Sequence, residues 1–106
     1  MLELTPAQKA IVCAIVDAHL PRENVLVFGS RAGSAAAGSA QPFRPAKPFS
    51  DLDLLILGPA LKDQLRGSLE EAFDESDLPF RVDIAEAASL EPAFLMRIQA
   101  QAVALA

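Results

Sequence analysis

Three aspartates, Asp51, Asp53 and Asp83, occur where two predicted strands can bring carboxylates together. Residues two apart in a strand point to the same face, so Asp51 and Asp53 project side by side. In the next predicted strand, alternation puts Val82 and Ile84 in the core and Asp83 on the opposite face. If the two strands are neighbours, all three carboxylates converge on one place.

Such a cluster is costly without a cation, because close carboxylates raise one another's pKa and resist joint ionisation. A divalent cation removes that cost, and hard oxygen ligands suit magnesium. The pattern therefore favours a Mg2+ site formed by Asp51, Asp53 and Asp83. The alternative interpretation is that each aspartate only marks the end of a strand.

A second group of residues, Gly29, Ser30 and Arg31, follows an apolar strand pattern. Glycine allows a tight turn after the strand, and Ser30 would open a helix whose free N–H groups attract an anion. The serine hydroxyl and the arginine guanidinium add donors for phosphate oxygens. By itself this group is a weak signal, and an ordinary strand–turn–helix connection explains it better.

The elements that position these residues alternate between helix and strand. Thr5-Pro6 with Gln8 predicts a capped helix start, and Leu20-Pro21 is expected to end that helix. Strands are predicted at residues 24–28, 50–57 and 80–85, helices begin at Gly58-Pro59 and Glu91-Pro92, and residues 102–106 are expected to add a short edge strand. The predicted fold class is α/β, with a small mixed β-sheet and packed helices.

The chain has 106 residues, which suits a single domain over residues 1–106, interrupted by a long loop rich in Pro, Ala, Gly and Ser at residues 33–49. The net charge is −5, which argues against a main role in gripping nucleic-acid phosphates. No apolar run is long enough for a membrane span, no basic, apolar leader is visible, and Cys13 has no internal partner for a disulfide. These features predict a cytoplasmic protein.

Taken together, the motifs resemble the nucleotidyltransferase superfamily that includes DNA polymerase beta and the aminoglycoside nucleotidyltransferases. Two stretches, Phe28-Gly29-Ser30-Arg31-Ala32 and Ser50-Asp51-Leu52-Asp53-Leu54, resemble its minimal nucleotidyltransferases in particular, as do Leu78 to Asp83 and the segment around Pro92 and Phe94. The resemblance covers nearly the whole chain. It departs from the family in the unusually long stretch between Gly29-Ser30 and Asp51.

The resemblance implies an ATP-dependent enzyme that transfers AMP and releases pyrophosphate. Asp51 and Asp53 would hold two Mg2+ ions against the triphosphate, and Asp83 would help to hold the catalytic ion and to deprotonate the acceptor hydroxyl. Gly29 and Ser30 would hold the triphosphate, and Arg31 would touch its terminal phosphate. The longer connection makes the placement of Arg31 the least fixed of these roles.

Minimal members of the family are typically paired with a small helical toxin, a nuclease of the HEPN type. The resemblance thus implies an antitoxin that attaches AMP to a tyrosine of its partner toxin within a hetero-oligomer. Two alternatives stay open: a binding-only antitoxin in which catalysis is dispensable, and a nucleotidyltransferase for a small molecule of the aminoglycoside type. The short length favours a protein acceptor over a small molecule.

Overall fold

The computed structural model describes residues 2–32 and 51–105, so the predicted loop at residues 33–49 lies outside the described residues. The helices are α1 (Pro6–Asp17), α2 (Asp63–Asp74) and α3 (Pro92–Gln101). The strands are β1 (Val25–Phe28), β2 (Leu52–Ile56), β3 (Val82–Glu86) and β4 (Val103–Ala104). Three short 3-10 turns, η1 (Arg22–Asn24), η2 (Gly29–Ala32) and η3 (Ala87–Ser89), complete the described elements.

The four strands form one mixed sheet in the order β3-β2-β1-β4. Strand β1 pairs antiparallel with both β2 and β4, whereas β2 and β3 run parallel. Because a parallel pair needs a crossover, α2 carries the chain from the end of β2 back to the start of β3. The predicted α/β class, the mixed sheet and the short terminal edge strand are confirmed.

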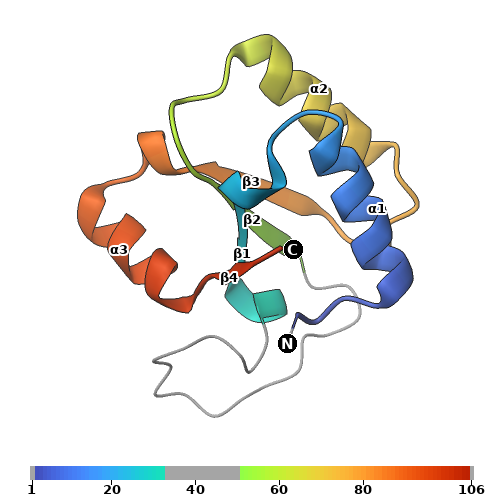
Figure 1. Ribbon diagram of the computed structural model, residues 1–106, viewed down its shortest axis with the longest axis horizontal. Helices are drawn as coiled ribbons and strands as arrows, with labels where there is room; N and C mark the ends of the chain where they lie inside the picture. The colour runs from blue at the N-terminus through green and yellow to red at the C-terminus, as the bar shows by residue number, and fades with distance from the viewer. Residues whose placement is uncertain (1, 33–50, 106) are drawn as a thin grey trace.

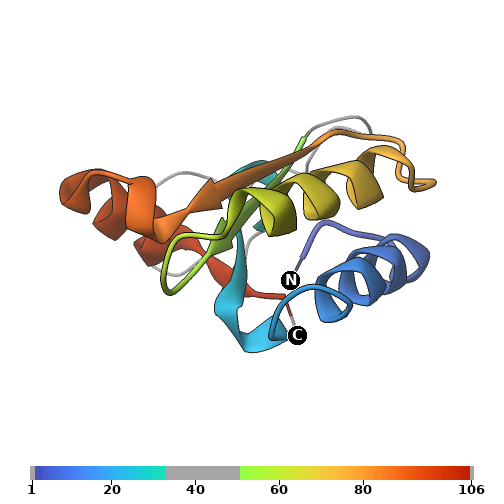
Figure 2. The same ribbon diagram turned by 90° about the horizontal axis from the view of Figure 1, so that it is seen from above.

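One face of the sheet forms the main core. Helices α1 and α2 contact each other and lie side by side in both views (Figures 1 and 2). Their buried side chains pack with alternate residues of the central strands. The members with no exposed surface are Val12, Val16, Val27, Leu52, Leu54, Leu69 and Leu105. Burying this apolar surface is the main stabilising contribution to the fold, at roughly 25 cal/mol per Å² removed from water.

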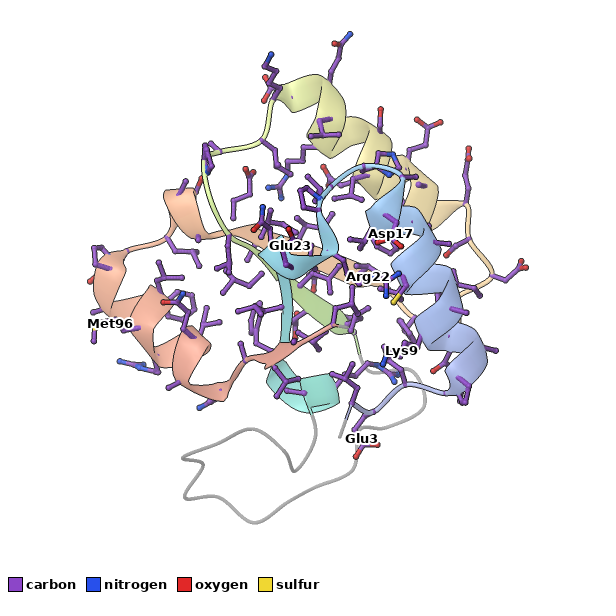
Figure 3. All side chains as sticks on the ribbon, viewed as in Figure 1. Glu3, Lys9, Asp17, Arg22, Glu23 and Met96 are labelled. Atoms are coloured by element: carbon purple, nitrogen blue, oxygen red, sulfur yellow. The ribbon has the colours of Figure 1, made fainter. Side chains whose placement is uncertain are left out.

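Helix α3 lies on the other side of the view in Figure 1, away from α1 and α2. It contacts β1 and η2, and its Ile98 is buried although it belongs to no part of the main core cluster. Two of its apolar side chains are exposed: Phe94 at 48% and Met96 at 72%. Figure 3 shows Met96 projecting outward from α3.

Local sequence signals explain how α1 begins. Thr5 accepts a hydrogen bond from the backbone N–H of Gln8 at 3.1 Å, and the Gln8 side chain accepts one from Thr5 N–H at 3.0 Å. This reciprocal capping box, with Pro6 as the first helical residue, confirms the predicted start. The predicted end at Leu20-Pro21 is late, because regular helix stops at Asp17 and a turn follows through Leu20.

The predicted start of α2 at Gly58-Pro59 is wrong, since the helix begins at Asp63. Gly58 has a φ of +89°, in the left-handed region that a right-handed helix does not use. Farther along, the Leu61 N–H donates to Glu86 Oε1 on β3 at 2.5 Å. This contact with a distant residue keeps the connection extended and delays the first helical turn.

Candidate active site

The structure brings Gly29, Asp53 and Asp83 together at one end of three neighbouring strands. The pairing places Phe28 of β1 opposite Asp53 of β2, and Asp53 opposite Asp83 of β3. These three positions form a row across the sheet, with strands about 5 Å apart. Gly29 follows directly after Phe28, so the predicted phosphate turn begins beside the carboxylates.

Strand alternation decides which face carries the carboxylates. Leu52 and Leu54 point into the core with no exposed surface, so Asp53 between them points to the opposite face. On β3, Val82 and Ile84 pack against the core, and Asp83 is half-exposed on the other face. The sequence prediction that Asp53 and Asp83 share a face of adjacent strands is therefore confirmed.

Close contact with Asp53 requires a glycine at position 29. Gly29 has a φ of +73°, which a residue with a side chain rarely adopts. A Cβ at this position would overlap Asp53 Oδ2 and lie 3.4 Å from Asp53 Cγ. The backbone of the turn after β1 thus passes directly against the carboxylate of β2, which only glycine permits.

Asp53 is the carboxyl group whose electrostatics are most consistent with a cation site. Its pKa is raised above the ordinary value, first by burial and then by the charges of Asp83 and Asp51. Both other aspartates therefore act on Asp53 as nearby negative charges. A bound divalent cation would offset this repulsion and the loss of water together.

The carboxylates do not form a ready-made cage. Within residues 2–32 and 51–105, no three His, Cys, Asp or Glu side chains stand as a group arranged to hold a metal ion. The donor set still fits Mg2+ chemically, because all three groups are oxygen ligands and two of them act electrostatically on the third. Asp51 lies directly before β2, and Asp83 is half-exposed. Both side chains therefore reach solvent and have room to rotate towards a bound cation.

Arg81, two residues before Asp83, forms a weak ion pair at this end of the sheet. Its Nη2 lies 3.6 Å from Asp83 Oδ1, and its side chain is 81% exposed. An exposed ion pair of this kind contributes at most about 1 kcal/mol. Strand alternation places Arg81 and Asp83 on the same face, which is consistent with this pair.

The remaining predicted residues, Ser30 and Arg31, lie in the short turn η2. Ser30 is exposed, as a phosphate contact requires. Arg31 is only 4% exposed: its Nη1 donates to the Glu3 carbonyl at 2.7 Å, and its guanidinium lies 4.0 Å from the centre of the Phe80 ring. Burial lowers the pKa of Arg31, and the nearby Glu3 charge partly offsets this. No signal in the sequence identifies Phe80 as its partner.

A sheet of this order, with a glycine turn against a row of carboxylates, defines a small nucleotidyltransferase domain. No family model matches the chain. The chain is 38% identical over 94 residues to a curated Haemophilus influenzae protein named "Probable protein adenylyltransferase MntA", covering 88% of this chain and 74% of that protein. The chain belongs to the minimal nucleotidyltransferase family, and it is a nucleotidyltransferase.

Among residues 2–32 and 51–105, none of the helices is long and apolar enough to cross a bilayer.

Proposed function

We propose that this protein is the antitoxin of a toxin–antitoxin pair and transfers AMP from ATP to a tyrosine hydroxyl of a HEPN-type partner toxin. The observation that carries the proposal is the row formed by Asp53 and Asp83 beside Gly29. The name of the Haemophilus influenzae relative, a probable protein adenylyltransferase, supports a protein acceptor. The two proteins act together in a cytoplasmic hetero-oligomer, with ATP as the AMP donor.

The proposed reaction is an in-line displacement at the α-phosphorus of ATP. The tyrosine oxygen forms a bond to this phosphorus, and the bond from phosphorus to the oxygen that bridges to the β-phosphate breaks. Pyrophosphate leaves, and the tyrosine proton passes to the Asp83 carboxylate. Asp83 is half-exposed, so an acceptor hydroxyl on a separate protein has access to it.

Two Mg2+ ions, held by Asp51, Asp53 and Asp83, would neutralise the phosphate charge and stabilise the attacking and leaving oxygens. The raised pKa of Asp53 supports this assignment, because the fold itself leaves the carboxylates repelling one another. Gly29 contributes a backbone that approaches closely, and Ser30 contributes an exposed hydroxyl for a phosphate oxygen. Arg31 is assigned no phosphate contact here, since its guanidinium is buried.

The test is transfer of label from α-labelled ATP with Mg2+, in lysate of the source cells and with the purified partner. Wild type is compared with Asp51→Ala/Asp53→Ala and with a matched control, Asp74→Ala/Asp77→Ala, which removes two exposed carboxylates at and beyond the end of α2. Label on one small protein that disappears only in the site variant supports the proposal. Label among small molecules favours an aminoglycoside-type enzyme, and toxin neutralisation by the site variant favours a binding-only antitoxin.

A further inference from the structure

Arg31 makes contacts with two segments that are distant from it in the chain. Its Nη1 donates to the Glu3 carbonyl at 2.7 Å, and the Glu3 N–H donates in return to the Arg31 carbonyl at 2.9 Å. Its guanidinium also lies over the Phe80 ring, 4.0 Å from the centroid. An arginine that is 4% exposed and engaged on an aromatic face is fixed in position and shielded from a ligand in solution.

The two residues of this contact, Arg31 and Phe80, each lie close in the chain to a residue of the site. Arg31 directly follows Ser30 in the turn η2, and Phe80 comes shortly before Asp83, at the entry to β3. The next residue after Phe80, Arg81, accepts a hydrogen bond through its carbonyl from the Leu52 N–H at 2.9 Å. The entry to β3 is therefore fixed on one side to β2, between Asp51 and Asp53, and on the other side to the turn η2.

We propose that Arg31 is a positioning residue that acts through Phe80 to set the spacing between the Gly29–Ser30 turn and the Asp83 carboxylate. The inference rests on the proposed function for its catalytic consequence. It assigns Arg31 a role different from that of a phosphate ligand. The hydrogen bonds with Glu3 hold the turn from the side of the N-terminal segment, and the ring holds it from the side of β3.

Two substitutions separate positioning from phosphate binding. Arg31→Lys keeps the charge, which suffices in part for a phosphate, but it loses the flat guanidinium that stacks on the ring. Phe80→Leu removes the ring and cannot remove a phosphate contact, whereas Phe80→Tyr keeps the ring. Matched controls are Arg22→Lys, in an exposed pair with Asp17 that Figure 3 shows, and Phe94→Leu on the exposed side of α3.

The experiment measures AMP transfer by the complete chain with its partner, and separately the binding of Mn2+ in the presence of ATP by water proton relaxation. We expect Arg31→Lys and Phe80→Leu each to lower kcat and to weaken Mn2+ binding by about 10-fold, with KM for ATP changed by less than about 2-fold. The double variant should lose less than the product of the two single losses, because both substitutions remove the shared contact between Arg31 and Phe80. Phe80→Tyr and both controls should behave like wild type.

The proposal is overturned if Arg31→Lys keeps its kcat, if the main effect falls on KM for ATP, or if the two defects multiply in the double variant. Urea unfolding of each variant establishes that it is folded, and Phe80→Met replaces Phe80→Leu if the latter unfolds. A wild type that transfers no label contradicts the proposed function. In that case the Mn2+ measurement still decides about Arg31, since cation binding needs no acceptor.

Discussion

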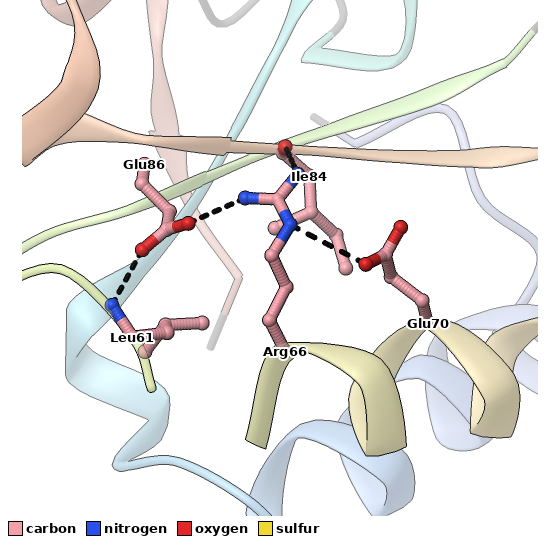
Figure 4. Close-up of polar contacts among 5 residues, drawn as sticks. All are labelled: Leu61, Arg66, Glu70, Ile84 and Glu86. Carbon is pink, nitrogen blue, oxygen red and sulfur yellow. Dashed lines mark hydrogen bonds and ion pairs between the residues drawn. The ribbon is translucent and has the colours of Figure 1, made fainter. Parts of the chain in front are cut away.

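The paired strands β2 and β3 carry carboxylates at both ends of the pair. At one end two carboxylates face each other, whereas at the other end a carboxylate is bound by hydrogen-bond donors. At one end Asp53 lies opposite Asp83. At the other end Glu86 lies opposite the apolar Ile56 and is bound by groups from outside the pair. Its carboxylate accepts from the Leu61 N–H and from Arg66 Nη1, and Arg66 also donates to the Ile84 carbonyl at 2.9 Å (Figure 4).

The pKa values follow this difference. The Leu61 N–H, followed by Arg66, lowers the pKa of Glu86 in spite of burial, whereas burial, Asp83 and Asp51 all raise the pKa of Asp53. The fold supplies its own cation at Glu86, whose side chain is only 10% exposed. Among residues 2–32 and 51–105, the cation paired at the Asp53 end is the exposed Arg81, which contacts Asp83. The carboxylates at the Asp53 end therefore stabilise the protein less than Glu86 does, and they are suited to binding a cation from solution.

The largest effect is expected from removing the charge at the site end. Asp53→Asn should lower AMP transfer by about 1,000-fold or more, because it removes a proposed Mg2+ ligand. The same change should raise the free energy of unfolding when no divalent cation is present, since it relieves repulsion from Asp83 and Asp51. Label transfer and urea unfolding in chelator measure the two effects. Asp77→Asn is the control, and a loss of both activity and stability in Asp53→Asn would contradict the comparison.

A second prediction concerns the glycine against Asp53. Gly29→Ala should lower activity by about 100-fold, because the new Cβ displaces the Asp53 carboxylate. Gly58→Ala is a matched control: its φ of +89° carries similar backbone strain, of about 1–2 kcal/mol, but no atom lies within 4 Å of the added Cβ. Both variants should lose stability through backbone strain, and Gly29→Ala should lose at least as much as Gly58→Ala because of its contact with Asp53. Equal activity losses in the two would show that strain alone, and not displacement of Asp53, limits the reaction.

At the opposite end, removing the built-in cation should affect stability and spare the chemistry. Arg66→Met leaves Glu86 with its hydrogen bond from the Leu61 N–H and should lower the free energy of unfolding by about 1–3 kcal/mol, a range between exposed and buried ion pairs. Urea unfolding measures this cost. Arg22→Met, in the exposed pair with Asp17, should cost less than about 1 kcal/mol. If Arg66→Met had normal stability but low activity, the claim that the Glu86 end affects only stability would be contradicted.

The smallest effect is a difference in pH dependence. The pKa of Glu86 is lowered from 4.5, so its contribution to stability is present above that value and is lost as pH falls through the folded pKa. The pKa of Asp53 is raised from 3.8, so its contribution is present below that value and is lost as pH rises through the folded pKa. Unfolding of Glu86→Gln and Asp53→Asn relative to wild type, from about pH 3.5 to 7 in chelator, should give difference curves of opposite slope.

Saturating Mg2+ provides the control for this pH experiment. It should reverse the slope that depends on Asp53, because Mg2+ binds the ionised carboxylate and lowers its pKa in the folded protein. The slope that depends on Glu86 should stay unchanged, because Glu86 is not a proposed ligand. Slopes of the same sign in chelator, or a Mg2+ effect on the Glu86 slope, would contradict the assignment of the two ends.

Local patterns in the sequence predict much of this arrangement. The Thr5 and Gln8 capping box identifies the start of α1, and strand alternation places Asp53 and Asp83 on one face before any pairing is known. Both signals come from neighbours in the chain, where periodicity constrains direction. Alternation brings the carboxylates together only if β2 and β3 are neighbours, and the pairing shows that they are.

What could not be predicted depends on contacts between distant residues. The delayed start of α2 follows from the bond between Leu61 and Glu86, and the burial of Arg31 follows from its contact with Phe80. No period or spacing links such positions, because their proximity exists only after the sheet has formed. The family resemblance implies a phosphate contact for Arg31, whereas the positioning role that we propose rests on these contacts between distant residues.

The row of Phe28, Asp53 and Asp83 has a consequence for how the protein reaches its native state. Its members come from three strands separated by long stretches of chain, and both intervening segments must close before the positions meet. The unfolded chain keeps these aspartates apart and fully hydrated, so their mutual repulsion arises only as the strands dock. Strand docking thus creates, in one step, both the affinity for a cation and the electrostatic resistance to docking. A divalent cation bound at the proposed site would therefore favour folding.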